Sequence, residues 1–101
     1  MEKKRFVPLT YIKVRTDKTK YTTLIDSGAN CSCITEGLVK ALGKQKNIEY
    51  RECAARAWND TLSQFLGTVH MDINIGKQKL KQLFYVAKKL GTGTQCLLGA
   101  D

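Results

Sequence analysis

The feature that most constrains this chain is an alternating segment that ends in the tripeptide Asp26-Ser27-Gly28. Successive side chains of an extended strand point to opposite faces, so Leu24 and Asp26 share one face and Ile25 points to the other. If Ile25 points into a core, Asp26 leaves the strand end as a presented carboxylate. Gly28 lets the backbone turn tightly and approach a ligand or a second chain closely. Asp-Ser-Gly is also a common turn tripeptide, so a second motif is needed to favour a catalytic carboxylate over a turn residue.

The rest of the chain consists of short strand patterns separated by turns, which predicts an all-β, barrel-like domain. Asp17-Lys18 is expected to turn between the first two strands. One short helix is expected from Thr35 through Leu42, ended by Gly43. Residues 80–87 are expected to form a strand that is buried on both faces around Leu83, Phe84, Tyr85 and Val86. The strand patterns lie at residues 11–15, 20–26, 31–35, 48–54, 62–75, 80–87 and 96–98. On the first, Ile12 and Val14 are expected to point inward; along 62–75, Val69, Met71, Ile73 and Ile75 share one face; and residues 44–47 are expected to form a polar loop.

Two short motifs, one early and one at the end of the chain, resemble the signatures of the retroviral-type aspartic proteases. Leu24-Ile25-Asp26-Ser27-Gly28-Ala29 resembles the active-site sequence of that family, two apolar residues followed by Asp, Thr or Ser, Gly and Ala. Cys96-Leu97-Leu98-Gly99-Ala100-Asp101 resembles its second hallmark, an apolar pair followed by Gly. This form is most similar to the proteases of long-terminal-repeat retrotransposons and plant pararetroviruses. The resemblance covers nearly the whole chain. It implies a small closed barrel of the retropepsin fold, with a flap hairpin and at most one short helix.

The resemblance implies an active site completed by two copies of the chain. Peptide hydrolysis by this chemistry uses two carboxylates that share one proton, because two like charges so close together cannot both ionise. The chain has a single Asp-Ser-Gly sequence, so the second carboxylate is expected to be Asp26 of another copy across a two-fold axis. One carboxylate would take a proton from water while the protonated one hydrogen-bonds to the scissile carbonyl. Ser27 is implied to hydrogen-bond across the axis, and Gly28 to accept the substrate backbone.

An extended peptide or polyprotein segment is the implied substrate, lying as an added strand between the cleft floor and the flap. The flap tip is expected around Trp58-Asn59-Asp60, where family flaps often carry glycines, and this indicates a bulkier and stiffer flap. A competing interpretation is a protease-like fold without turnover that serves as a dimerisation or interaction module. The residues expected to contact substrate are Leu24, Ala29, Asn30, Cys31, Trp58, Asn59 and Leu97.

Length and hydropathy predict one domain, residues 1–101, with a modest core. No apolar run reaches membrane-spanning length, and no apolar segment follows the Lys/Arg-rich N-terminus, so we expect neither a membrane partner nor a signal peptide. The expected location is the cytoplasm of a host cell, within a polyprotein or a virus-like particle. In retroviral relatives a helix and a dimer-forming strand follow the second motif. The sequence stops at Asp101, so we expect a domain shortened at its C-terminus relative to the natural polyprotein, and a weak homodimer or a monomer in isolation.

The formal net charge of +8 raises the question of nucleic-acid binding. The lysines are spread along the whole sequence, and no basic helix interleaved with aromatic residues collects them. The sequence therefore favours solvated strand faces and turns, with no specific nucleic-acid partner. A weak, nonspecific attraction to RNA that vanishes with salt is the remaining alternative.

Four cysteines and His70 are the candidate metal ligands, and their spacing argues against a metal site. Cys31 and Cys33 are closer together than the usual zinc-knuckle pair, and Cys53 and Cys96 are scattered. We therefore expect buried cysteines, no metal and no cofactor. His70 is expected on an exposed strand face. No feature of the sequence places it beside a cysteine, as a cysteine protease would require.

Overall fold

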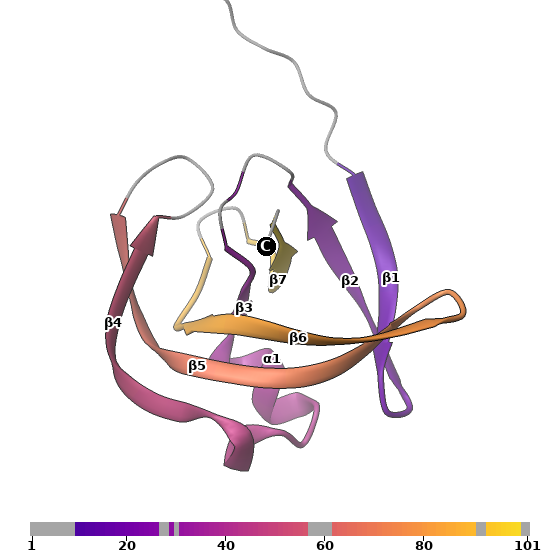
Figure 1. The fold of residues 1–101 in the computed structure, drawn as a ribbon, viewed down its shortest axis with the longest axis horizontal. Helices are drawn as coiled ribbons and strands as arrows, with labels where there is room; N and C mark the ends of the chain where they lie inside the picture. Colours follow the sequence, from indigo (N-terminus) through magenta and orange to yellow (C-terminus); the bar gives the residue numbers. More distant parts are fainter. Residues whose placement is uncertain (1–9, 27–28, 30, 57–61, 91–92, 100–101) are drawn as a thin grey trace, which may run out of the picture.

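The computed structural model describes residues 10–26, 29, 31–56, 62–90 and 93–99, and its strands form one curved sheet (Figure 1). The strands pair in the order β1-β2-β7-β3-β6-β5-β4, and a further pairing of β1 with β5 closes six of them into a barrel. This confirms the predicted all-β, barrel-like class. The bounds are β1 Thr10–Thr16, β2 Thr19–Ile25, β3 Cys33–Thr35, β4 Glu49–Arg56, β5 Leu62–Ile75, β6 Gln78–Ala87 and β7 Cys96–Leu98.

β1 and β2 form a hairpin around the predicted turn. The two strands pair antiparallel from Thr10 opposite Ile25 to Thr16 opposite Thr19. Asp17 adopts a left-handed conformation with φ of 55°, which a short polar side chain tolerates in a tight turn. The predicted turn at this position is therefore confirmed.

A short helix, α1 (Glu36–Ala41), follows β3 as predicted. The Thr35 hydroxyl caps it by accepting a hydrogen bond from the Leu38 N–H at 3.3 Å. Leu38 is buried in the core, and Gly43 follows the helix with a φ of 75°, a conformation that favours glycine. The next segment, expected to be a loop, contains one turn of 3₁₀ helix, η1 (Gln45–Asn47).

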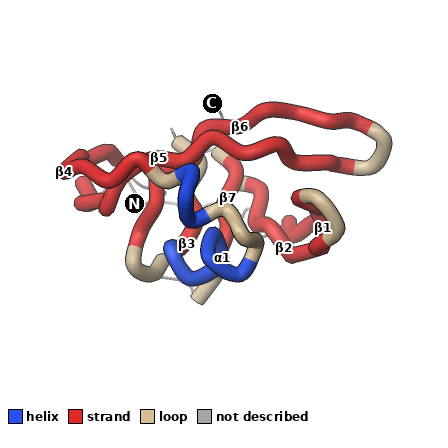
Figure 2. The backbone as a smooth tube through the Cα atoms, turned by 90° about the horizontal axis from the view of Figure 1, so that it is seen from below, coloured by secondary structure: helices blue, strands red, loops and turns tan. Residues whose placement is uncertain are grey.

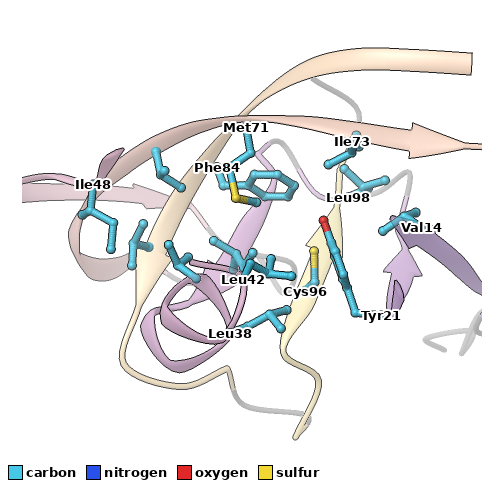
Figure 3. Packing of buried hydrophobic residues seen from close by; sticks show 14 residues of the cluster. Val14, Tyr21, Leu38, Leu42, Ile48, Met71, Ile73, Phe84, Cys96 and Leu98 are labelled. Atoms are coloured by element: carbon cyan, nitrogen blue, oxygen red, sulfur yellow. The ribbon is translucent and has the colours of Figure 1, made fainter. Parts of the chain in front are cut away.

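The core fills the space between the β5–β6 hairpin, α1 and the inner faces of β1, β2 and β7 (Figure 3). Val69, Met71 and Ile73 alternate into it along β5, as the sequence predicted, and Phe84 of β6 is fully buried beside them. Burying each such side chain stabilises the fold by roughly 1.5–3 kcal/mol. The cluster consists of Val14, Tyr21, Ile34, Leu38, Val39, Leu42, Ile48, Val69, Met71, Ile73, Phe84, Val86, Cys96 and Leu98.

The predicted burial of β6 on both faces is confirmed only in part, because Phe84 and Val86 are buried whereas Leu83 and Tyr85 are half-buried, and the first part of the strand is exposed. The strand begins at Gln78, and its residues through Lys81 are exposed, with Leu80 39% exposed. The reason is topological: β3 pairs only with the end of β6, at Tyr85 to Ala87, whereas the earlier residues pair with β5 alone. Figure 2 shows this part of the β5–β6 hairpin as an arm that projects past the barrel.

β4 and β5 form the antiparallel hairpin predicted for the flap, with an irregularity in β4 between Tyr50 and Cys53. The expected flap tip falls at residues 57–61, which lie outside the described residues. Among the helices of the described ranges, none is long and apolar enough to cross a membrane.

Candidate active site

The two sequence motifs lie side by side in the fold. β2 pairs in parallel with β7, and this places Ile25 opposite Leu98. Immediately after β2, the Asp26 N–H donates to the Leu98 carbonyl at 2.9 Å. On its other side β7 pairs antiparallel with β3, the strand that follows the loop carrying Asp26. The C-terminal motif is therefore the strand that holds both ends of this loop together (Figure 1).

The backbone turns sharply at Asp26. Its carbonyl accepts a hydrogen bond from the Ala29 N–H at 3.0 Å, the bond expected of a four-residue turn. Beneath the turn, Leu24, Ala29 and Leu97 form a small buried cluster. Asp26 itself is half-buried. The carboxylate thus comes from a backbone fixed by β7 and by the turn, which is the rigid presentation that general acid–base chemistry needs.

The loop approaches the end of β7 so closely that only a glycine fits at position 99. A Cβ added at Gly99 would lie 2.6 Å from the Cys31 carbonyl oxygen and 2.8 Å from that of Ala29. Both atoms belong to the backbone, so no side-chain rotation relieves the clash. The glycine of the second motif is therefore explained by contact with the first motif.

Ser32 is a positioning residue that the sequence analysis missed. It is fully buried, and its hydroxyl accepts hydrogen bonds from the Gly99 N–H at 3.1 Å and from the Gln82 side-chain amide at 3.3 Å. Its carbonyl accepts from the Tyr85 N–H at 2.9 Å. Ser32 thus links the chain leaving the loop to β6 and to the end of β7. The available sequence signal was a hydroxyl within the otherwise apolar segment 31–34.

The described substrate-contact candidates are all buried within the chain. Leu24, Ala29 and Leu97 lie in one cluster, whereas Cys31 lies in another with Cys33, Phe65 and Ala87. The structure therefore shows these four as packing that supports the loop, and their contact with substrate stays a prediction. The other predicted site residues, Ser27, Gly28, Asn30, Trp58 and Asn59, lie outside the described residues.

The described cysteine side chains and His70 do not gather into a metal site or a catalytic site. Burial raises the pKa of the Cys96 thiol to about 12, so Cys96 stays protonated at neutral pH and is no nucleophile. The Sγ atoms of Cys31 and Cys33 lie 3.9 Å apart in the buried cluster. His70 is exposed on β5, as predicted. Over the described ranges, no three His, Cys, Asp or Glu side chains gather in a way that could hold a metal ion.

Comparison with known proteins connects this geometry to a family. Residues 12–101 match the family model described as "gag-polyprotein putative aspartyl protease". The fold is similar to the retroviral protease-like domain of Ddi1 from Leishmania major, with a TM-score of 0.73 and 16% identity over 96% of this chain and 72% of that chain. No curated protein sequence matches the chain significantly.

Two proteases of known structure share the same architecture. A retropepsin-like aspartic protease from Rickettsia conorii aligns with a TM-score of 0.60 and 20% identity, over 91% of this chain and 66% of that chain. The simian foamy virus protease aligns with a TM-score of 0.58 and 13% identity, over 89% of this chain and 87% of that chain. At these identities the structures establish a shared fold.

Proposed function

Because the chain belongs to the gag-polyprotein aspartyl protease family and has the retropepsin-like fold, we propose that it is an aspartic endopeptidase active as a homodimer. The observation that carries the proposal is the placement of Asp26. The one Asp-Ser-Gly carboxylate of the chain stands at the point where β2, β7 and the loop are fixed together. Since the chemistry needs two carboxylates, the other comes from Asp26 of a second copy.

In the proposed dimer the two Asp26 carboxylates hold one proton between them, because like charges at close range cannot both ionise. The ionised carboxylate takes a proton from the attacking water. The protonated one donates a hydrogen bond to the scissile carbonyl and stabilises the charge that develops there. Ser27 hydrogen-bonds across the axis to the opposite loop and keeps the two carboxylates coplanar, while Gly28 lets the substrate backbone approach.

The proposed substrate is an extended segment of a viral or retrotransposon polyprotein. An extended peptide fits because its backbone pairs as an added strand with the edges around the site. The β4–β5 hairpin is the element that covers it, with Trp58 and Asn59 as proposed contacts at the tip. Cleavage is proposed to take place in the host cytoplasm, within the polyprotein or an assembling particle.

The test is cleavage of a peptide library, read by mass spectrometry, with wild-type protein, Asp26→Asn and the control Asp72→Asn. Asp72 is an exposed carboxylate on β5 that pairs with Lys81 at 3.9 Å, so the control makes the same chemical change elsewhere. We expect Asp26→Asn to lower the rate by roughly 10²–10⁴-fold or more, the range for a lost acid–base group. Asp72→Asn is expected to retain wild-type activity.

A separate measurement tests whether activity requires two chains. Specific activity should fall on dilution, and an excess of Asp26→Asn protein should inhibit wild-type protein by forming mixed dimers with one carboxylate. A statine-type inhibitor should block cleavage and promote pairing in sedimentation. Undiminished cleavage by Asp26→Asn would falsify the proposal. Tight self-association without cleavage at any pH from mildly acidic to neutral would instead establish an interaction module.

A further inference from the structure

Two hairpins that are distant in the sequence meet at one end of the barrel and bring cationic residues together. Arg15 of β1 lies opposite Lys20 of β2 on one side and opposite Asn74 of β5 on the other. Asn74 in turn lies opposite Lys79 of β6. Directly opposed residues share a face, so four neighbouring strands place three cations and an amide in one row. All three cations are exposed. Figure 1 shows the two hairpins crossing at this place.

The row borders a hollow of about 250 Å³ in the surface. The Asn74 side-chain amide donates to the Arg15 carbonyl at 3.4 Å, which helps to hold this residue at the crossing. The described residues that line the hollow include three cations and no carboxylate; they are Lys13, Val14, Arg15, Lys20, Asn74 and Gly76. The hollow is therefore a concave surface of one charge sign, and it favours an anionic ligand.

The acidic residues nearby in the sequence are each engaged by a different cation. Asp17, in the turn between β1 and β2, pairs with Lys44 at 3.0 Å. Asp72, two residues before Asn74 on β5, pairs with Lys81 at 3.9 Å. Meanwhile Arg15 and Lys20 stand directly opposite each other, an arrangement of like charges that destabilises a strand pair. An anion bound across the pair would relieve this repulsion.

An aromatic side chain adjoins the cations. Tyr11 lies two residues before Lys13 on β1, on the same outward face, and is 49% exposed. Cations in a groove together with an exposed aromatic ring are the combination that binds single-stranded nucleic acid, because the cations contact phosphates while an unpaired base stacks on the ring. An acidic protein segment or a lipid headgroup would use the cations but not the ring.

We propose that the cationic face formed by Tyr11, Lys13, Arg15, Lys20, Asn74 and Lys79 binds single-stranded nucleic acid through its phosphodiester backbone, without sequence preference. The inference is independent of the proposed peptidase activity. Lys20 lies near the start of β2 and Asp26 follows its last residue, and six residues of strand span roughly 20 Å. The cations are therefore distant from Asp26, whereas Tyr11, opposite Leu24, is the part of the face that lies toward the candidate active site.

The experiment measures fluorescence anisotropy of a labelled single-stranded RNA of mixed sequence across a salt titration. It compares wild-type protein, the triple variant Arg15→Gln/Lys20→Gln/Lys79→Gln and the matched triple variant Lys40→Gln/Lys46→Gln/Lys88→Gln. The matched lysines are exposed and do not line the hollow, and each of the two variants removes three positive charges. We expect the first variant to bind at least about tenfold more weakly, with a salt slope lower by roughly 2, because each phosphate contact contributes about 0.7 for single strands. The matched variant should bind nearly as wild type.

A second pair of variants tests the aromatic contact. Tyr11→Ala should weaken binding to single-stranded RNA and to single-stranded DNA by roughly fivefold or more, whereas binding to duplex DNA should change little, because duplex bases are not free to stack. Tyr50→Ala is the control, since Tyr50 is 50% exposed on β4, outside the cationic face. Equal affinity for RNA and DNA single strands is expected, because both offer phosphates to the cations and unpaired bases to the ring.

Several outcomes would overturn the proposal. Equal losses in the two triple variants would show that binding follows net charge and needs no cationic face. Absence of RNA binding at low salt would show that nucleic acid is not the ligand of this face. Tighter binding to phosphatidylserine vesicles or to polyglutamate than to RNA would assign the face to a different partner. Circular dichroism and a urea midpoint for each variant show whether it is folded, so that a loss of binding is not mistaken for unfolding.

Discussion

The two ends of β2 differ in how their residues affect stability. At its C-terminal end, Asp26 is held by β7, by its own turn and by the close fit of Gly99, all of which favour one backbone arrangement. At its N-terminal end, Lys20 is exposed and stands opposite Arg15, a like charge. The comparison teaches that one strand can be fixed at one end for a chemical site while its other end carries residues that act against stability. Substitutions should therefore have large costs at the first end and small gains at the second.

The largest effect is expected at Gly99. In Gly99→Ala the new Cβ meets two backbone carbonyls, of Cys31 and Ala29, that cannot move without displacing the loop. We expect the free energy of unfolding to fall by about 3 kcal/mol or more, at the upper end of overpacking effects, because backbone and not side chain must give way. Urea denaturation followed by circular dichroism measures the change.

Gly37→Ala is the matched control for Gly99→Ala. A Cβ at Gly37, on α1, meets nothing within 4 Å. In a helix with free space around the site, alanine should raise the free energy of unfolding by about 0.5–1 kcal/mol. If the two substitutions had similar effects, the claim that the loop and the end of β7 fit too closely for any side chain would be wrong.

The next effect concerns two buried ionisable groups, Tyr21 of β2 and Cys96 of the neighbouring strand β7. Burial raises the pKa of Cys96 from its ordinary value of 9.0 to about 12. Burial also raises the pKa of Tyr21 from 10.0 to about 12, opposed by its hydrogen bond to Thr16. Both groups are therefore neutral in the fold, and the stability that they contribute is complete below the unfolded pKa values and lost as pH rises toward 12.

The expected result is a fall in the free energy of unfolding that begins near pH 9 and reaches about 3 kcal/mol from Cys96 by pH 11, one pKa unit being worth about 1.4 kcal/mol. Cys96→Ala should start from lower stability at neutral pH but lose less between pH 9 and 11. Tyr21→Phe should flatten only the part of the curve above pH 10. Urea midpoints across this range measure the slopes. A wild-type midpoint that is constant from pH 8 to 11 would contradict the burial of both groups.

A smaller effect is expected at Ser32. Ser32→Ala removes a fully buried acceptor of the Gly99 N–H and of the Gln82 amide, which also donates to the Leu83 carbonyl at 3.0 Å. We expect a loss of about 1–3 kcal/mol, the cost of depriving the Gly99 N–H of its acceptor in a part-buried place. The double variant Ser32→Ala/Gln82→Leu should lose less than the sum of the two single changes, because it removes one unpaired donor together with its acceptor. Strict additivity would show that the Ser32–Gln82 bond does not couple β6 to the loop.

The sequence was sufficient for those parts of the fold that depend on local patterns. Alternation along 11–15 and 62–75 gave the strands and the inward residues of β1 and β5, and the Thr35 cap with Gly43 gave the ends of α1. It was not sufficient for the projecting part of β6, because the exposure of Leu80 depends on where β3 stops pairing. A two-residue period shows that a strand alternates but not which neighbour covers it.

The candidate site also contains some residues that the sequence predicts and others that it does not. Asp26 was predictable because its motif is continuous in the sequence, and Gly99 followed from the resemblance. Ser32 and Gln82 were not predictable, since they lie 50 residues apart and meet only through the pairing of β3 with β6. The cationic face was hidden for the same reason. Its lysines are scattered in the sequence, and a single residue pair between β1 and β5 brings the two hairpins together.

The smallest expected effect is the one with the opposite sign. Arg15→Gln removes a charge that stands directly opposite Lys20, so we expect the free energy of unfolding to rise by roughly 0.2–1 kcal/mol at low salt. Because salt screens exposed charges, the gain should shrink as ionic strength increases. Lys40→Gln, on the exposed face of α1, is the control, and it should show no such salt-dependent gain. If Arg15→Gln proved destabilising at every salt concentration, the arginine would be a structural residue, and the contrast between the two ends of β2 would fail. If it stabilises the fold while weakening binding to single-stranded RNA, the same residue costs stability and supplies affinity, which is the trade expected of a binding surface.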